Sequence, residues 1–212
     1  FHLAVWEFDA TGRPDAAEQL LASRTPQQAG SPAGITNQFR WDLIKGDCAA
    51  ALRLRPPSSG PERRFTWDRR DTDLALRVAD PVAAQPYLGY SRELLQAMLV
   101  KQPKRALYWA WLAEVEALLG DRPAALTAAD KAVNFLPETT DRWEGPTYTA
   151  YRAMVYAWVG DTDRAIDEFA RLLQTQIGLS VHEMKHDPYY LPLQGNPRWE
   201  ALLNDPKNNA PL

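Results

Sequence analysis

The sequence predicts an all-α fold built from antiparallel helix pairs. Apolar residues recur three and four positions apart, as they do on one face of a helix, along most of the 212 residues. Short turns that contain glycine interrupt these stretches, and two of the glycines, Gly12 and Gly46, lie 34 residues apart. Pro103 and Pro137, which each end a helical stretch, are separated by the same interval. A period of this length is typical of helical-repeat arrays.

The composition excludes several classes of partner and structure. Hydrophobic residues make up 45% and charged residues 24% of the chain, as in folded water-soluble proteins. The formal net charge is −3 and no long basic run occurs, so we expect no nucleic-acid partner for this region. No apolar run approaches the length of a membrane span, and no span is expected. The single Cys48 excludes an internal disulfide but does not identify the compartment.

The best-defined unit is residues 106–137. It contains two helical stretches separated by Gly120, which we expect to adopt the left-handed conformation that a Cβ would penalise. Small side chains in the second stretch allow it to approach its neighbours closely. Seven residues define the unit. The first stretch contains the large Trp109 and Leu112 and the small Ala113, Gly120 forms the turn, the second stretch contains the small Ala125 and Ala132, and Pro137 ends it.

These residues and their spacing resemble the tetratricopeptide repeat, and residues 147–173 match it in the same way. The resemblance implies a right-handed superhelical solenoid whose units bury their apolar faces against one another and which holds other proteins. We expect one continuous solenoid. Its parts are degenerate repeat-like pairs over 1–103, two well-formed repeats over 104–179, and a C-terminal capping segment and tail over 180–212.

The degenerate part contains three expected pairs, at 1–24, 35–55 and 71–103. In the third pair, Leu74, Val78 and Val82 are expected to share one face of a helix that Pro81 kinks or shortens.

A short connector over 62–70 precedes this third pair. It carries Arg63, Arg64, Arg69 and Arg70 around one tryptophan. A contact with a phosphate or an acidic partner is one interpretation, but a solvated linker is favoured.

The last segment carries a pattern of Asp-Pro, Pro-Leu, Pro-Arg-aromatic and Leu-Leu. It occupies Asp187, Pro188, Pro192, Leu193, Pro197, Arg198, Trp199, Leu202 and Leu203. This pattern resembles the segment that closes repeat arrays in bacterial regulators, where such arrays follow a winged-helix DNA-binding domain, a nucleotide cyclase or a protein kinase. The resemblance implies a non-catalytic protein-interaction or regulatory module. An envelope assembly scaffold is an alternative.

The chain opens with Phe1 at a position that the pattern places within a helix, so we expect it to be the C-terminal part of a longer bacterial signalling protein. Any enzymatic or DNA-binding activity would then belong to an upstream domain. The sequence does not decide whether this part is cytoplasmic or periplasmic, nor its oligomeric state.

One motif favours a different function. His182, Glu183 and His186 match H-E-x-x-H, which on a helix presents two zinc ligands and a general base, as in a zinc-dependent hydrolase. However, Asp187-Pro188 disfavours continuation of that helix, and the longer signature with a third histidine is absent. A coincidental match is therefore favoured. We find no Gly-rich phosphate loop, nucleophile elbow or Cys/His cluster, and we predict no catalytic residue and no cofactor.

A partner-binding groove is the remaining candidate site. In tetratricopeptide repeats the first helix of each pair lines a concave face, and by register this face should present Trp6, Arg40, Glu114, Met154 and Trp158. Exposed aromatic and arginine side chains are common anchors of a peptide. For Trp158, packing under the C-terminal segment is an equally good interpretation. The expected partner is a protein or peptide.

Overall fold

The computed structural model describes residues 3–54, 65–175 and 179–208, and within them all regular secondary structure is helical, as predicted. Consecutive helices contact each other in pairs: α1 (Leu3–Thr11) with α2 (Pro14–Ala22), α4 (Pro32–Ile44) with α5 (Cys48–Leu54), α6 (Trp67–Ala79) with α7 (Pro81–Lys101), α8 (Ala106–Leu119) with α9 (Arg122–Phe135), and α10 (Gly145–Trp158) with α11 (Thr162–Leu172). A single turn, α3 (Pro26–Ala29), precedes α4. The chain then forms α12 (Val181–His186), the 3-10 helix η2 (Pro188–Leu193) and α13 (Pro197–Asn204).

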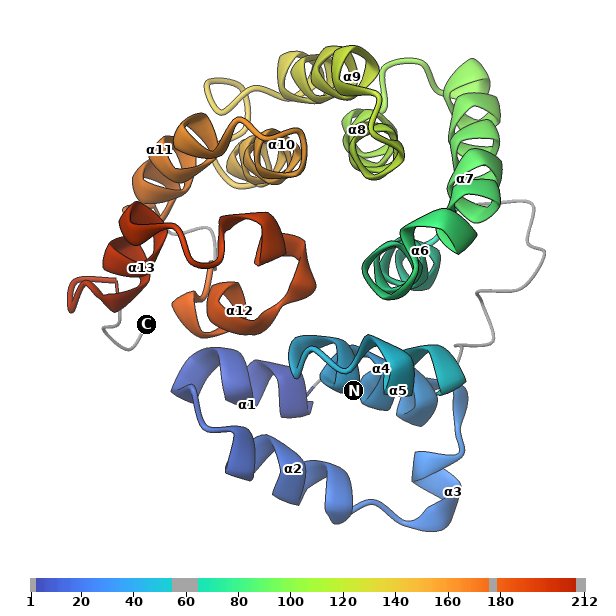
Figure 1. Ribbon diagram of the computed structural model, residues 1–212, viewed down its shortest axis with the longest axis vertical. Helices are drawn as coiled ribbons and strands as arrows, with labels where there is room; N and C mark the ends of the chain where they lie inside the picture. Colours follow the sequence, from blue (N-terminus) through green and yellow to red (C-terminus); the bar gives the residue numbers. More distant parts are fainter. Residues whose placement is uncertain (1–2, 55–64, 176–178, 209–212) are drawn as a thin grey trace.

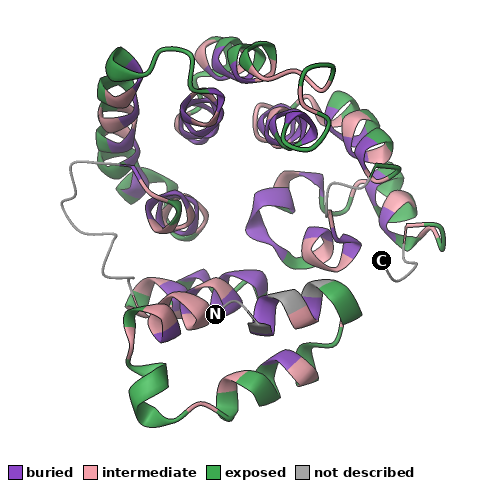
Figure 2. Cartoon of the chain, turned by 180° about the vertical axis from the view of Figure 1, so that it is seen from behind, coloured by how far each residue is buried: buried purple, intermediate pink, exposed green. Residues whose placement is uncertain are grey.

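The helix pairs are arranged around a centre. In Figure 1, α6, α8 and α10 form an inner row, and α7, α9 and α11 lie outside them. The view from behind in Figure 2 shows the inner row largely buried and the outer row exposed on its far side. The two ends of the array meet, because α12 contacts α1. The C-terminal segment thus lies between the last pair and the first.

Glycines in the left-handed region turn the chain within four of the pairs. The φ values are 65° at Gly12, 76° at Gly46, 86° at Gly120 and 83° at Gly160. At Gly120 an added Cβ would meet no atom within 4 Å, so the backbone conformation rather than space requires glycine there. At Gly12 a Cβ would also lie 2.5 Å from the His182 imidazole, which brings α12 directly against this turn.

Small side chains allow the central helices to pack closely. The α8–α9 interface is lined by alanines that are almost fully buried, among them Ala113, Ala125 and Ala132. Aromatic side chains fill the space at the C-terminal end, where the Trp199 ring lies 5.5 Å from Phe169 of α11 and 5.8 Å from Tyr190 of η2. The C-terminal segment therefore covers apolar surface of the last helix pair.

The structure corrects the prediction for residues 71–82. Pro81 does not kink a helix. The helix before it ends at Ala79, so the prediction of a shortened helix is confirmed, and Pro81 is the first residue of α7, where its missing N–H costs nothing. The Asp80 carboxylate accepts hydrogen bonds from the backbone N–H groups of Val82 and Ala83, and so caps the new helix. Val82 consequently starts a different helix from Leu74 and is 81% exposed.

The favoured interpretation of the 62–70 connector was also wrong for Arg69 and Arg70. Thr66 accepts a hydrogen bond from the Arg69 N–H and begins α6, so both arginines belong to a helix and both are buried. Arg63 and Arg64 lie outside the described residues.

Among the helices within the described ranges, none combines the length and apolar character that a membrane span needs.

Candidate functional site on the inner face

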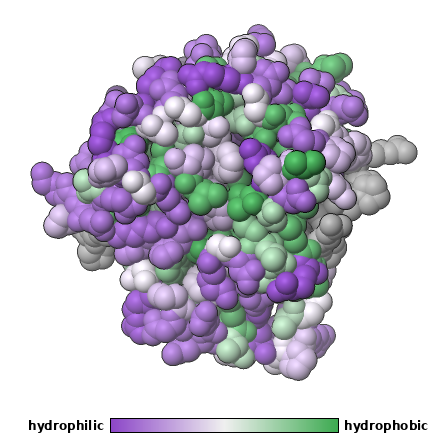
Figure 3. All heavy atoms as spheres, in the orientation of Figure 1, coloured by the Kyte–Doolittle hydropathy of each residue, from purple (hydrophilic) through white to green (hydrophobic). Residues whose placement is uncertain are grey.

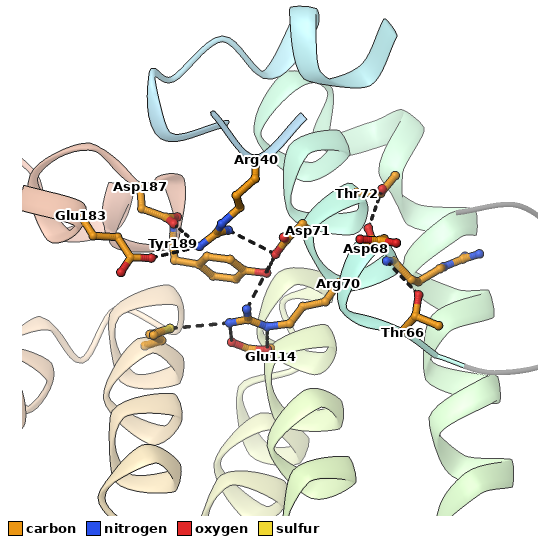
Figure 4. A network of polar contacts seen from close by, with 12 residues as sticks. Arg40, Thr66, Asp68, Arg70, Asp71, Thr72, Glu114, Glu183, Asp187 and Tyr189 are labelled. Atoms are coloured by element: carbon orange, nitrogen blue, oxygen red, sulfur yellow. Dashed lines mark hydrogen bonds and ion pairs between the residues drawn. The ribbon is translucent and has the colours of Figure 1, made fainter. Parts of the chain in front are cut away.

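Four of the five predicted groove residues lie around the C-terminal segment. Arg40 comes from α4, Glu114 from α8, and Met154 and Trp158 from α10; each contacts this segment or a side chain that does. Figure 4 shows Arg40 and Glu114 on either side of Tyr189, a residue of η2. The fifth, Trp6, belongs to α1, but its side chain lies outside the described part of the structure.

Arg40 connects the N-terminal helices to the C-terminal segment. Its Nη2 lies 3.0 Å from Glu183 Oε1 and 2.9 Å from Asp187 Oδ2, and its Nη1 lies 3.4 Å from Asp71 Oδ1. Burial alone would lower the pKa of Arg40, but the carboxylates of Asp71, Asp187 and Glu183 raise it above its ordinary value. One guanidinium therefore holds carboxylates from α6, from α12 and from the junction between α12 and η2.

A second arginine lies on the other side of Tyr189. Arg70 of α6 forms a two-pronged pair with Glu114, with both N···O distances 2.6 Å, and its guanidinium lies 3.9 Å from the centre of the Tyr189 ring. Burial raises the pKa of Glu114, against the opposing effect of Arg70. The Sδ atom of Met154 lies 3.9 Å from Arg70 Nη2. Glu114 and Met154 thus support the arginine that holds the Tyr189 ring.

Trp158 is half-buried and donates its indole N–H to the backbone carbonyl of Tyr189 at 3.0 Å. The Tyr189 hydroxyl in turn donates to Asp71 at 3.2 Å. Trp158 therefore packs under the C-terminal segment, which is one of the two interpretations that its position in the sequence allowed.

A cavity of about 160 Å³, open to solvent on one side, adjoins this network. It is lined by Arg40, Arg70, Thr147, Ala150, Tyr151, Met154, Leu179, Glu183, Asp187, Tyr189 and Tyr190. Figure 3 shows that, in the view of Figure 1, apolar residues gather toward the centre of the molecule, with hydrophilic residues around them. The cavity thus combines charged groups with aromatic and apolar walls.

The H-E-x-x-H residues take part in packing. The rings of His182 and His186 lie 6.4 and 5.5 Å from the Phe8 ring of α1, and Glu183 is paired with Arg40. Burial, and then the neighbouring charge of Lys185, lowers the pKa of both histidines. In the described part of the chain, no group of three or more His, Cys, Asp or Glu side chains is arranged to hold a metal ion.

Sequence reasoning missed Arg70, Asp71 and Tyr189 as members of the site. A helix-start signal was present: Thr66 is a good N-cap, and Asp68 follows in the first turn. That signal would have placed Arg70 and Asp71 in a helix. No local signal in the sequence connects them to Tyr189, 118 positions beyond Asp71.

Comparison with known proteins finds no matching family model, no matching curated protein and no matching solved structure.

Proposed function

We propose that this chain is a non-catalytic, tetratricopeptide-type module that binds another protein through its inner face. We further propose that it is the C-terminal part of a larger bacterial signalling protein, as the resemblance of its capping segment implies. Two features support the repeat assignment. Four of the five pairs turn at left-handed glycines, and the first helices of three successive pairs form the inner row.

The observation that carries the proposal is the cavity on the inner face. Concave faces of helical-repeat proteins are extended binding surfaces, because every unit contributes its first helix to them. Here α10 contributes Thr147 and Met154 to the cavity, and the C-terminal segment adds Glu183 and Tyr189. Aromatic and charged side chains around a hollow are the groups that usually anchor a protein partner.

Site-specific photo-crosslinking tests the proposal. A benzophenone side chain replaces Thr147, which is exposed and lines the cavity, and in a matched control it replaces Thr127, which is exposed on α9 in the outer row. In extracts of the source cells, position 147 should crosslink to a discrete protein and position 127 should not. Equal products at the two positions, or none at position 147, would overturn the proposal.

A further inference from the structure

We infer that the exposed side of α7 binds a second copy of this chain, with the two α7 helices side by side and antiparallel. In Figure 1, α7 lies in the outer row of helices. The described residues that line the inner-face cavity come from other elements, so the contact would leave that cavity open. The pairing of two copies therefore does not depend on the protein-binding function proposed above.

Apolar side chains follow one another along the exposed side of α7. Val82 and Val100, at opposite ends of the helix, are 81% and 84% exposed to solvent. Exposed residues recur between them every three or four positions, which places them on one side of a helix. Together they form what we call the α7 face: Val82, Pro86, Tyr90, Glu93, Ala97 and Val100. It lies opposite the buried side of α7, which carries Leu88, Leu95 and Leu99.

The outer helices differ in the charge of their exposed sides. In α11 every exposed residue is charged, and these residues are Asp163, Arg164, Asp167 and Arg171. Among the exposed residues of α7, only Glu93 and Lys101 are charged. A helix side that faces water is normally polar, whereas an apolar side with this spacing packs against another element. The α7 face therefore has the composition of a contact between helices.

The order of residues on the α7 face is nearly the same in both directions along the helix. When the α7 helix of a second copy lies antiparallel and the centres of the two faces coincide, Val82 meets Val100 of the second copy. In the same arrangement Pro86 meets Ala97 of the second copy. A contact between two identical chains related by a two-fold axis has to be self-complementary in this way. The α7 face meets that requirement without a third element.

The charges near the α7 face select the antiparallel arrangement. This arrangement places Lys101, the last residue of α7, close to Asp80 of the second copy, which caps the start of that helix. Near the centre, Glu93 comes close to Arg92 of the second copy, whose side chain is 40% exposed. A parallel arrangement would instead bring each charged residue against the same residue of the second copy, and like charges repel.

The size of the contact limits its strength. A helix of 21 residues is about 30 Å long and about 10 Å wide, so two such helices bury about 600 Å² in total when they lie side by side. Stable complexes bury roughly 1,200–2,000 Å². We therefore expect a reversible dimer with a micromolar or weaker dissociation constant, which forms as the protein concentration rises.

Sedimentation equilibrium over a hundredfold range of protein concentration tests the inference. The mass of the parent chain should rise from that of a monomer toward that of a dimer. The double variant Val82→Glu/Val100→Glu should stay monomeric, because acidic side chains then oppose each other across the contact. Both positions are exposed, so its urea midpoint should equal that of the parent.

The control Thr127→Glu/Asn134→Glu adds the same charge to the exposed side of α9 and should dimerise like the parent. A parent chain that stays monomeric at every concentration would overturn the inference. So would a dimer that Val82→Glu/Val100→Glu leaves intact.

Single cysteine substitutions test the orientation. Under mild oxidation, a mixture of Val82→Cys and Val100→Cys chains should form a disulfide-linked dimer, because these positions meet in the antiparallel pair. Each variant alone should link at least tenfold less, because its two cysteines would lie about 27 Å apart along the helix axis. The native Cys48 is buried and is the same in all samples. Equal linkage in the mixture and in either variant alone would contradict the antiparallel contact.

Discussion

Replacement of Arg40 by methionine should destabilise the protein by about 3 kcal/mol. The change keeps much of the apolar volume but removes the guanidinium that contacts Asp71, Glu183 and Asp187. Removing one partner of a buried ion pair typically costs about 3–5 kcal/mol, because the other charge stays buried. Arg40 is 19% exposed and Glu183 is 24% exposed, so water offsets part of the loss and the lower value applies.

Urea denaturation followed by circular dichroism measures this loss, and a thermal melt should show a decrease in Tm of about 6–12 °C. Arg198→Met is the matched control, because Arg198 also bridges two carboxylates, Asp163 and Asp167, but all three side chains are more than half exposed. Surface pairs of this kind contribute little to stability, because water screens both charges. The reasoning would be refuted if Arg40→Met cost no more than Arg198→Met.

Three further predictions concern packing and pH. Ala125→Glu should lower the free energy of unfolding by several kcal/mol, because it buries an unpaired charge between α8 and α9. The control Thr127→Glu, on the exposed side of α9, should change this free energy by less than about 0.5 kcal/mol. Similar urea midpoints for the two variants would contradict the packing of α9 against α8 at Ala125. The pKa of His182 and of His186 is lowered in the folded protein, so stability should fall as the pH decreases below about 6.5, the ordinary imidazole value. A variant with leucine at both positions should lose less stability between pH 7.5 and pH 5.5. An equal loss in the variant and the parent would exclude the two histidines as the cause. Burial raises the pKa of Asp73 to about 7, so stability should be lost as the pH rises from about 4 to 7. Asp73→Asn removes this titrating group, so the stability of the variant relative to the parent should be higher at pH 8 than at pH 4; a constant difference at both pH values would contradict it.

Local sequence patterns predicted the helices where a single signal dominates. Gly120 requires a left-handed turn and Pro137 cannot continue a helix, so the pair between Ala106 and Pro137 was predicted from nearby residues. Pro81 was ambiguous, because a proline can either distort a helix or begin one. The side chain of Asp80, which caps the helix that starts at Pro81, decides between these two possibilities.

The closure of the array could not be predicted in this way. Arg40 was placed on the inner face from its register, but its partner Asp187 is 147 positions away, and the spacing of residues along one helix says nothing about which distant element faces it. The capping pattern around Asp187 and Trp199 indicated packing on the last pair. It gave no indication that the same segment also meets α1 and α4.

Hydrogen exchange by mass spectrometry on the Arg40→Met variant tests most directly whether Arg40 joins the two ends of the chain across the inner face. Peptides from 181–193 should exchange faster than in the parent protein, because Glu183 and Asp187 lose the guanidinium that anchors them to α4. Peptides from α9, which belongs to the central pair, should be unchanged. Unaltered exchange in 181–193, or an equal increase in α9, would contradict the account.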